Sequence, residues 1–258
     1  MIRPVFLYFC KHFSEIIVTE RKTYLILSIY KHLFFDLDRT LWDFDTNNKE
    51  TFLEMCTHFK LQEKGIDDAN LFYNIYQKIN IALWEAYKSG KITKERLNFS
   101  RFNHSLSICN ISDNELASDM AAHYIQKSPL KTNLYPGTIE VLDKLLPKYD
   151  MHIVTNGFEE VQFTKIENSG LKKYFKNIIT SEMAGFRKPD KRFFDYALNK
   201  TKARPNESIL IGDDPDADIL GAHQIGMDQI WVKHKPVKPE TQKPTYAVNS
   251  LKEILDIL

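Results

Sequence analysis

The stretch HLFFDLDRTLWDFD, residues 32–45, places two carboxylates directly after a short apolar run. The apolar residues 33–35 have the continuous hydrophobic character of a strand buried on both faces of a parallel sheet. Side chains at i and i+2 of an extended segment share one face, so Asp36 and Asp38 are expected to converge. Carboxylates this close repel each other, which favours a site where a metal ion, a proton or a reaction uses them. The alternative is a solvated junction between strand and turn, where aspartate is common.

The composition of the 258-residue chain is that of an ordinary globular protein, with 43% hydrophobic and 27% charged residues. Its 35 Lys and Arg nearly balance its 34 Asp and Glu, so the net charge is +1. Such a chain has no overall positive field that would recruit a nucleic acid polymer or an acidic membrane. The three cysteines, Cys10, Cys56 and Cys109, are widely spaced and form no CxxC pair. This pattern predicts free thiols and a reducing, cytoplasmic location.

The first thirty residues differ from the rest of the chain. Two apolar runs of seven, PVFLYFC (4–10) and YLILSIY (24–30), are separated by charged residues. Each run is well short of the roughly 18 residues that span a bilayer. We therefore expect residues 1–30 to be an appendage to the folded protein and not a membrane anchor.

Beyond residue 30, short apolar runs alternate with helical patterns. Strands are expected at residues 32–35, 151–155, 177–180, 208–212 and 229–232. Helices are expected between them, at residues 138–146, 159–169, 189–199 and 216–225. Repeated strand–helix units of this kind predict an α/β fold with a doubly wound parallel sheet.

The interval 46–130 interrupts this alternation, because it contains no convincing strand. Apolar residues four apart, at positions 71, 75, 79 and 83, predict a long amphipathic helix with aromatic residues beside the stripe. The segment SDNE (112–115) has the form of a capping box that opens another helix. We therefore expect a core of residues 31–45 and 131–258, with residues 46–130 inserted as an all-helical domain.

Polar residues follow four of the expected strands, at the edge of the sheet where open α/β folds bind ligands. Taken one by one, these residues also fit ordinary turns, helix starts and solvated caps. Taken together, they bring carboxylates, a hydroxyl, an amide and one lysine to one edge of the sheet. In chain order they are Asp36 and Asp38, then Thr155 and Asn156, then Lys188, and finally Asp213, Asp214, Asp216 and Asp218.

The segments DLDRT (36–40), TNG (155–157), KP (188–189) and GDDPDAD (212–218), in this order, resemble the four motifs of the haloacid dehalogenase-like hydrolases. The likeness covers residues 31–258, and the helical insert resembles the cap domain of that superfamily. The longer segments FFDLDRTLWDF, TNGFEEVQ, GFRKPD and GDDPDADILGA are similar to the bacterial pyrimidine 5'-nucleotidase branch. The resemblance implies a Rossmann-like core with a helical cap, and a Mg²⁺-dependent phosphatase whose substrate is a small phosphorylated metabolite, here a nucleoside monophosphate.

The resemblance also implies a role for each motif residue. Asp36 would attack phosphorus to form an aspartyl-phosphate, and Asp38 would act as general acid and then as general base. Mg²⁺ would be held by Asp36, the backbone carbonyl of Asp38 and Asp213. Asp218 would orient the waters of the metal, with Asp214 as the second choice for that role. The phosphoryl oxygens would be bound by Thr155, Asn156 and Lys188.

One residue departs from the superfamily pattern. Arg39 stands where glycine is most common, and glycine permits backbone angles that other residues avoid. We therefore expect Arg39 to affect the hinge of the cap and the choice of substrate. Aromatic residues next to the motifs either line the space of the leaving group or pack cap against core; they are Trp42, Phe44 and Phe158.

Other functions share parts of this pattern. A phosphatase of another small metabolite, or a phosphomutase that uses a substrate hydroxyl as acceptor, would need the same catalytic residues. A haloacid dehalogenase would use the first aspartate without Mg²⁺ and would not need an acid at Asp38. An inactive binding protein on this fold would need none of the set. The sequence leaves the oligomeric state open between a monomer and a homodimer.

Overall fold

The computed structural model describes residues 16–17, 25–26, 29–234 and 243–258. The expected appendage, residues 1–30, therefore lies mostly outside the described residues. Within it, β1 (Ile16–Ile17) and β2 (Leu25–Ile26) pair with each other in antiparallel fashion. No helix in the described part of the chain is both long and apolar enough to cross a membrane.

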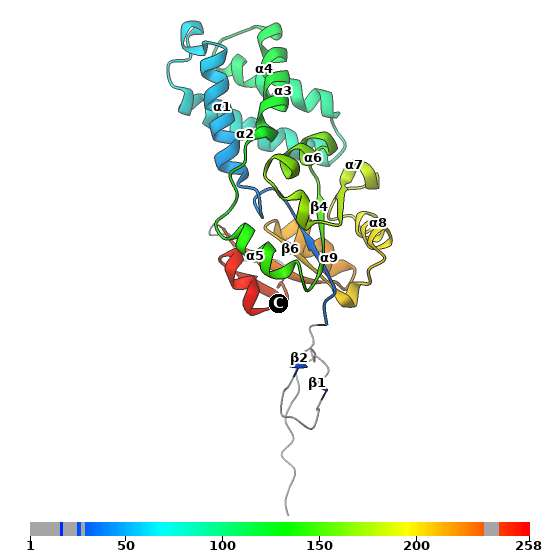
Figure 1. Ribbon diagram of the computed structural model, residues 1–258. Coiled ribbons are helices and arrows are strands. Elements are labelled where there is room, and N and C mark those ends of the chain that lie inside the picture. The colour runs from blue at the N-terminus through cyan, green and yellow to red at the C-terminus, as the bar shows by residue number, and fades with distance from the viewer. Residues whose placement is uncertain (1–15, 18–24, 27–28, 235–242) are drawn as a thin grey trace, which may run out of the picture.

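A parallel six-stranded sheet lies at the centre of the part of the molecule below the helical bundle (Figure 1). Its strand order is β5-β4-β3-β6-β7-β8. The five expected strands are confirmed to within one residue at their ends. The strand β8 is not predicted from the sequence, because this short edge strand has only one buried residue. The strands are β3 (His32–Phe35), β4 (Asp150–Thr155), β5 (Asn177–Thr180), β6 (Ser208–Gly212), β7 (Asp228–Val232) and β8 (Tyr246–Val248).

The central strand β3 is apolar from Leu33 to Phe35 because both faces of the sheet are covered. Leu33 and Phe35 are buried in the hydrophobic cluster on one face, whereas Phe34 is buried in the cluster on the other. Burying one such side chain contributes about 1.5–3 kcal/mol to stability. The side chains of the strand therefore fix its position in the middle of the sheet. They also fix the position of Asp36, the residue that directly follows the strand.

Helices cover both faces of the sheet, close to where they are expected. The expected helix at 216–225 is wrong in its first part, since Pro215–Leu220 forms a π-helical turn, η5, before a short α9. The α-helices are α5 (Thr138–Leu145), α6 (Glu159–Asn168), α7 (Ser181–Ala184), α8 (Lys191–Thr201) and α9 (Gly221–Gln224). Short 3₁₀ turns are η3 (Lys172–Tyr174), η4 (Pro205–Glu207) and η6 (Leu251–Asp256).

The segment between β3 and α5 is helical, as expected, and packs into a bundle beside the sheet (Figure 1). The helix expected from the apolar stripe exists, but its buried face is offset by one residue: Leu71 is exposed, whereas Phe72 and Tyr76 are buried. The expected capping box is also displaced, because Asp113 and not Ser112 caps α4. The elements are α1 (Phe44–His58), η1 (Leu61–Lys64), α2 (Ala69–Lys88), α3 (Lys94–Ile108), α4 (Asn114–Lys127) and η2 (Ser128–Leu130).

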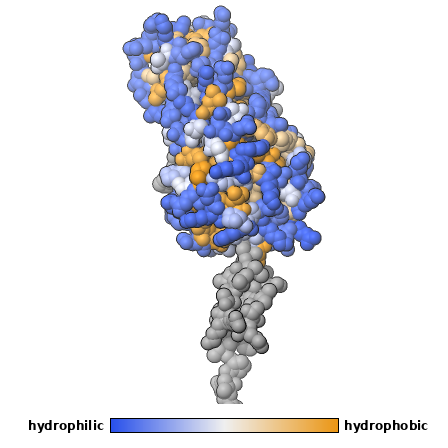
Figure 2. All heavy atoms as spheres, in the orientation of Figure 1, coloured by the Kyte–Doolittle hydropathy of each residue, from blue (hydrophilic) through white to orange (hydrophobic). Residues whose placement is uncertain are grey.

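Contacts of the helical bundle with the start of α6 and with α7 join the two parts of the molecule. Lys94 Nζ lies 3.0 Å from a carboxylate oxygen of Glu160 and 2.9 Å from one of Glu182. The ring of Phe158 stacks on Trp84 with ring centroids 5.2 Å apart. Figure 2 shows that the surface around this junction is mostly hydrophilic, with hydrophobic residues in small groups. The bundle therefore lies over the edge of the sheet that bears the motif residues.

Candidate active site

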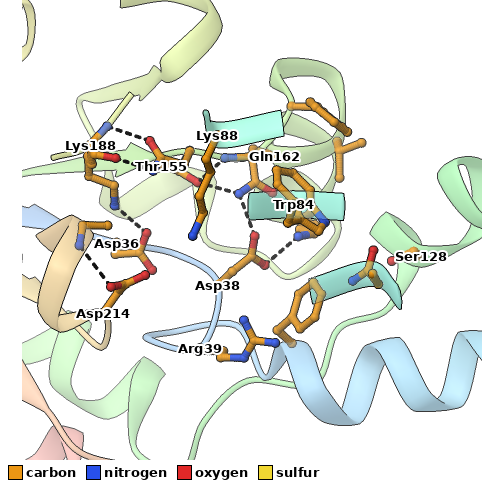
Figure 3. A pocket seen from close by; sticks show the side chains of 18 of the residues that line it. Asp36, Asp38, Arg39, Trp84, Lys88, Ser128, Thr155, Gln162, Lys188 and Asp214 are labelled. Atoms are coloured by element: carbon orange, nitrogen blue, oxygen red, sulfur yellow. Dashed lines mark hydrogen bonds and ion pairs between the residues drawn. The ribbon is translucent and has the colours of Figure 1, made fainter. Parts of the chain in front are cut away.

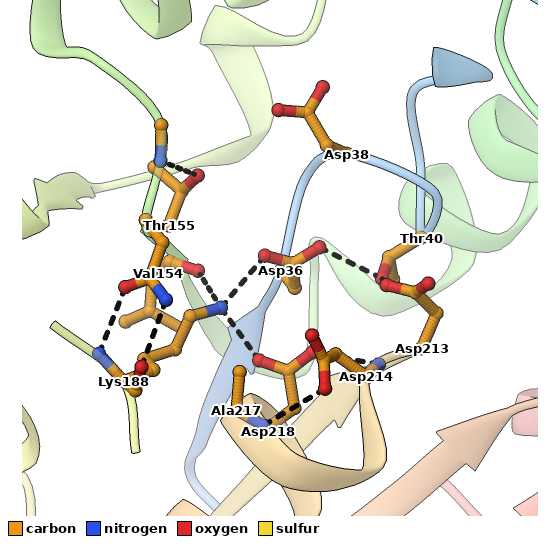
Figure 4. Close-up of polar contacts among 12 residues, drawn as sticks. Asp36, Asp38, Thr40, Val154, Thr155, Lys188, Asp213, Asp214, Ala217 and Asp218 are labelled. Carbon is orange, nitrogen blue, oxygen red and sulfur yellow. Dashed lines mark hydrogen bonds and ion pairs between the residues drawn. The ribbon is translucent and has the colours of Figure 1, made fainter. Parts of the chain in front are cut away.

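Lys188 lies at the centre of the polar residues that follow the strands (Figure 4). Its Nζ donates hydrogen bonds to Asp36 Oδ1 at 2.8 Å, Asp218 Oδ1 at 2.6 Å and the carbonyl of Val154 at 2.9 Å. Burial lowers the pKa of this lysine, but the two carboxylates raise it more, so the net shift is upward. The ammonium is therefore charged and joins residues from three segments of the chain.

The position of Lys188 depends on Asn156, the residue after the end of β4. The Asn156 amide nitrogen donates to the Lys188 carbonyl at 3.0 Å, and its Oδ1 accepts from the Lys188 backbone N–H at 2.9 Å. The peptide bond between Lys188 and Pro189 is cis. Both polar atoms of the Asn156 side chain are thus used to hold the lysine. Its expected contact with phosphoryl oxygens stays a prediction, and its place in the structure is beside the lysine backbone.

Asp36, Asp213 and Asp218 form a group of carboxylates, and one oxygen atom from each lies within 4.8 Å of one from each of the others. Thr40 contacts two of them, with its hydroxyl 3.1 Å from Asp36 Oδ2 and 3.4 Å from Asp213 Oδ1. Three carboxylates beside one ammonium leave an excess of negative charge. Oxygen ligands and negative charge are what Mg²⁺ prefers in proteins, so the residues present fit this ion.

The electrostatics of these carboxylates support the same assignment. Burial raises the pKa of Asp213 well above its ordinary value, and the charges of Asp36 and Asp218 raise it further. Burial also raises the pKa of Asp218 to about 7, although Lys188 opposes the shift. Close like charges without a compensating cation are unfavourable, and a divalent cation among them would offset that cost.

The turn after β6 brings Asp218 close to the sheet. Asp214 caps this turn, because its Oδ1 accepts from the backbone N–H groups of Asp216 and Ala217 at 3.0 Å. Its own N–H lies 3.2 Å from Asp218 Oδ2. A Cβ on Gly212 would lie 2.3 Å from that same oxygen, so the approach requires glycine. Asp218 thus contacts Lys188, whereas Asp214 holds the turn; which of the two orients the waters of the metal stays a prediction.

Asp38 lies apart from this group and contacts α6 instead (Figures 3 and 4). Lys165 Nζ donates to Asp38 Oδ1 at 2.6 Å, and Gln162 Nε2 donates to Asp38 Oδ2 at 2.9 Å. The same amide nitrogen of Gln162 also donates to Thr155 Oγ1 at 2.7 Å. Two residues of one helix thus fix the carboxylate of Asp38 and the hydroxyl of Thr155 relative to each other.

The sequence analysis missed both Lys165 and Gln162. Lys165 is buried, with Nζ 4.2 Å from the centre of the Trp42 ring, and burial lowers its pKa although Asp38 opposes the shift. The available signal is helical spacing: Gln162 and Lys165 are three apart and share the face of α6 that buries Ile166. Polar residues on a buried helix face are uncommon unless they are paired, which marks them as candidates for a site.

Arg39 adopts the backbone conformation for which glycine is normally used. Its φ is +64°, in the left-handed region that costs a residue with a Cβ about 1 kcal/mol or more. The side chain is exposed, with Nε 3.1 Å from Asp45 Oδ1 and Cζ 4.4 Å from the centre of the Phe44 ring. The turn after Asp38 therefore places Arg39 in a left-handed conformation although the residue is not glycine.

A pocket of about 320 Å³ lies between the helical bundle and the sheet, and it contains the motif residues (Figure 3). Asp36, Lys188 and Thr155 line the sheet side. Of the three aromatic residues considered from the sequence, Phe44 and Phe158 line the pocket, whereas Trp42 is fully buried behind it. Further lining residues come from α2, α3 and η2 of the bundle, including Asn80, Trp84, Lys88, Arg101 and Ser128.

Comparisons with known proteins agree with this geometry. Residues 33–232 match the family described as haloacid dehalogenase-like hydrolase. The pyrimidine 5'-nucleotidase YjjG of Escherichia coli is 32% identical over 231 residues, which cover 88% of this chain and 96% of that protein. The pyrimidine 5'-nucleotidase PynA of Streptococcus pneumoniae is 32% identical over 232 residues, which cover 89% and 95%.

Solved structures share the fold of this chain. The magnesium-bound HAD-hydrolase YfnB of Bacillus subtilis has a TM-score of 0.78 and 29% identity, covering 89% of this chain and 98% of that one. The L-2-haloacid dehalogenase of Xanthobacter autotrophicus has a TM-score of 0.68 at 16% identity, covering 88% and 98%, and shows a shared fold alone. The family match spans most of the chain and includes every strand end that bears a motif residue. The chain therefore belongs to the haloacid dehalogenase-like hydrolases.

Proposed function

We propose that this hydrolase is a Mg²⁺-dependent phosphatase of pyrimidine nucleoside 5'-monophosphates that acts through an aspartyl-phosphate on Asp36. The observation that supports it most is that the two aspartates are held by different residues. Asp36 is held by Lys188 among other carboxylates, whereas Asp38 is held by Lys165 and Gln162. Residues 46–130 would act as the cap over a catalytic core of residues 31–45 and 131–258.

The reaction would proceed in two displacements. An Asp36 carboxylate oxygen attacks phosphorus, the bond from phosphorus to the leaving oxygen breaks, and Asp38 gives that oxygen a proton. Water then attacks the phosphorus of the aspartyl-phosphate, Asp38 accepts the proton of the water, and the bond to Asp36 breaks to release inorganic phosphate. Lys188 and the hydroxyl of Thr155 would bind phosphoryl oxygens as their charge changes.

Asp36, Asp213 and the backbone carbonyl of Asp38 would hold Mg²⁺, and Asp218 would hold Lys188 and orient metal-bound water. When bound, Mg²⁺ would neutralise charge on the phosphoryl group and align it with the nucleophile. No backbone N–H in the described residues donates to the Asp38 carbonyl, so this oxygen is available as a ligand. The lysine and the metal would together balance the charge of the carboxylates.

The substrate class is proposed from the pocket and from the relatives. The pocket has room for more than a phosphate, and apolar rings such as Trp84 and Phe158 line it. A planar base would cover such surface, whereas a small sugar phosphate would leave it exposed to water. Two relatives that align over nearly their whole length are named pyrimidine 5'-nucleotidases.

A panel of phosphomonoesters tests this proposal. With Mg²⁺, kcat/KM for dUMP and dTMP is expected to exceed the values for phosphoglycolate, a hexose phosphate and a purine monophosphate. Activity should be lost with a chelator and restored by Mg²⁺, and Ca²⁺ should inhibit because its geometry is less strict. If phosphoglycolate or the hexose phosphate were better by tenfold or more, the nucleotide assignment would be wrong. Full activity in the chelator would contradict the phosphatase chemistry itself.

Replacement of Asp38 by Asn separates the acid role from the nucleophile. The rate of phosphorylation is expected to fall by about 10²–10⁴-fold for a nucleoside monophosphate, whose leaving alcohol needs a proton. The fall should be much smaller for p-nitrophenyl phosphate, whose leaving group needs little protonation. Rapid-quench measurement of the first turnover gives both rates. Equal losses for the two substrates would remove Asp38 from the acid role.

A further inference from the structure

The bundle side of the pocket contains buried polar atoms that have no hydrogen-bond partner. Seven such side-chain atoms occur in the described residues, and four of them belong to the packed helices α2 and α3: Tyr76 OH, Asn80 Oδ1, Ser100 Oγ and Arg101 Nε. Native proteins leave few buried polar groups unsatisfied, because each costs about 1–3 kcal/mol. Two of the four residues, Asn80 and Arg101, also line the pocket, so their unpaired atoms indicate that a partner is missing there.

Arg101 is the most informative member of this cluster. The residue is only 4% exposed, and its guanidinium has no carboxylate within ion-pair distance among the described residues. One of its nitrogens, Nη2, donates to Asn98 Oδ1 at 3.0 Å, and its Cζ lies 4.5 Å from the centre of the Tyr124 ring. A buried cation without an anionic partner is unfavourable unless a ligand completes its hydrogen bonds.

The orientation of this guanidinium is fixed by the core of the bundle. Tyr124, on which it stacks, donates from its hydroxyl to Asn48 Oδ1 at 2.7 Å. Asn48 in turn donates from its amide to the Tyr73 hydroxyl at 3.3 Å. These residues are buried, so Arg101 rests on a fixed aromatic surface and does not have to be ordered by its ligand.

Asn80 is the second polar residue in this wall of the pocket. It is 7% exposed, and it lines the same pocket as Arg101 and Asp36. In the view of Figure 3, Asp36 lies on one side of the pocket and Ser128 of the bundle on the other, with Trp84 between them. A substrate whose phosphate lies at Asp36 would thus extend past the ring of Trp84 toward the polar residues of the bundle.

We propose that Arg101 and Asn80 bind the carbonyl edge of the pyrimidine base, which makes them the residues that determine specificity for the leaving nucleoside. This inference rests on the proposed nucleotidase function. The guanidinium offers only donors, and every natural pyrimidine base presents an acceptor oxygen at C2. The amide of Asn80 offers both a donor and an acceptor, which suits the N3 and C4 edge of either kind of pyrimidine.

A small carboxylate-bearing substrate is the competing ligand for a buried guanidinium. It would pair with Arg101, but it would leave the amide of Asn80 unsatisfied and the rings of Trp84 and Phe158 uncovered. The base satisfies both polar side chains and covers the apolar wall. The observations therefore favour the base, and phosphoglycolate becomes a necessary arm of the test.

The first test changes the substrate and leaves the protein intact. Wild-type kcat/KM is compared for dTMP, for the monophosphate of its difluorotoluene isostere, and for 2-deoxyribose 5-phosphate. The isostere keeps the shape of thymine but lacks its strong hydrogen-bonding groups. We expect dTMP to exceed the isostere by about 10–100-fold, because the loss of a partner for a charged donor is costly. Equal values for the two would overturn the proposal.

The second test compares Arg101→Met with Arg96→Met, an exposed arginine on the same helix. The measured quantity is the ratio of kcat/KM for dTMP to that for 2-deoxyribose 5-phosphate. It is expected to fall by about 10–100-fold in Arg101→Met and to be unchanged in Arg96→Met. Asn80→Ala should lower the ratio by about 5–10-fold, since the amide is neutral.

Three outcomes would overturn the inference. An unchanged ratio in Arg101→Met, with equal losses for both substrates, would mean that the arginine supports the bundle only. A wild-type preference for phosphoglycolate that disappears in Arg101→Met would assign the guanidinium to a carboxylate. Release of phosphate from other phosphomonoesters but from no nucleotide would show that the proposed function had failed as well. If Arg101→Met does not fold, the comparison of dTMP with its isostere still decides the question.

Discussion

Replacement of Asp36 by Asn is expected to lower kcat by at least about 10⁴-fold, while the protein still folds. The amide keeps the shape of the side chain but cannot attack phosphorus. Lys188 retains the Asp218 carboxylate at 2.6 Å and the Val154 carbonyl at 2.9 Å, so its ammonium is not left unpaired. Steady-state release of phosphate and thermal unfolding together measure the two parts of this expectation.

The matched control is Asp216→Asn. Asp216 is an exposed residue of the acidic run 213–218, and its side chain does not belong to the carboxylate group of Asp36, Asp213 and Asp218. This variant should keep at least about half of the wild-type rate, as is usual for surface substitutions away from a site. If Asp36→Asn retained more than about a tenth of the activity, the aspartyl-phosphate mechanism would be wrong for this protein.

Replacement of Lys188 by Met is expected to lower both activity and stability. The change leaves Asp36 and Asp218 buried without their cation, which should lower the free energy of unfolding by about 3–5 kcal/mol in the absence of metal. The control is Lys191→Met, an exposed lysine at the start of α8, for which the change should stay within about 0.5 kcal/mol. Urea denaturation in the presence of a chelator gives these values.

The loss of unfolding free energy in Lys188→Met should depend on pH, because the pKa values of the neighbouring carboxyl groups are shifted. Burial already raises the pKa of Asp218 to about 7 and raises that of Asp36, and removal of the ammonium should raise both further. A carboxyl group whose pKa is raised on folding stabilises the folded state at low pH and loses that effect as the pH rises through its folded pKa. The difference in unfolding free energy between the wild type and Lys188→Met should therefore shrink as the pH falls from about 8 toward 6. A difference that stayed constant over this range would mean that the lost stability comes from packing and not from charge.

The sheet could be predicted from the sequence because its strands are buried on both faces. Residues 33–35 and 209–211 are apolar at every position and buried, as is typical of strands covered on both faces. The edge strand β8 lacks this signal, since one of its three residues is exposed. The offset of the buried face of α2 has a different cause: Leu71 is as apolar as its neighbours, and only tertiary packing decides which stripe is covered.

The candidate site could be predicted only where residues follow strands. Asp36, Asp213 and Lys188 are found because the ends of parallel strands share one edge of the sheet. Lys165 was missed because its partner, Asp38, is far away in the sequence and only the docking of α6 brings them together. The contacts of Asn156 with the Lys188 backbone could not be predicted for a similar reason, since the chain path near Lys188 decides what its amide contacts. Residues of the bundle, such as Arg101, join the site through the packing of a separate group of helices.

Direct detection of phosphorylated Asp36 is the measurement that tests the central claim most closely. Asp38→Asn is mixed with p-nitrophenyl phosphate and Mg²⁺ and quenched in acid, and its peptides are analysed by mass spectrometry. The variant should still be phosphorylated by this substrate but should hydrolyse the intermediate slowly, because the attacking water lacks its base. The account predicts one phosphoryl group on the peptide that contains Asp36, and none in the Asp36→Asn, Asp38→Asn double variant. Release of phosphate at the rate of p-nitrophenol, with no phosphorylated peptide at any time, would contradict it.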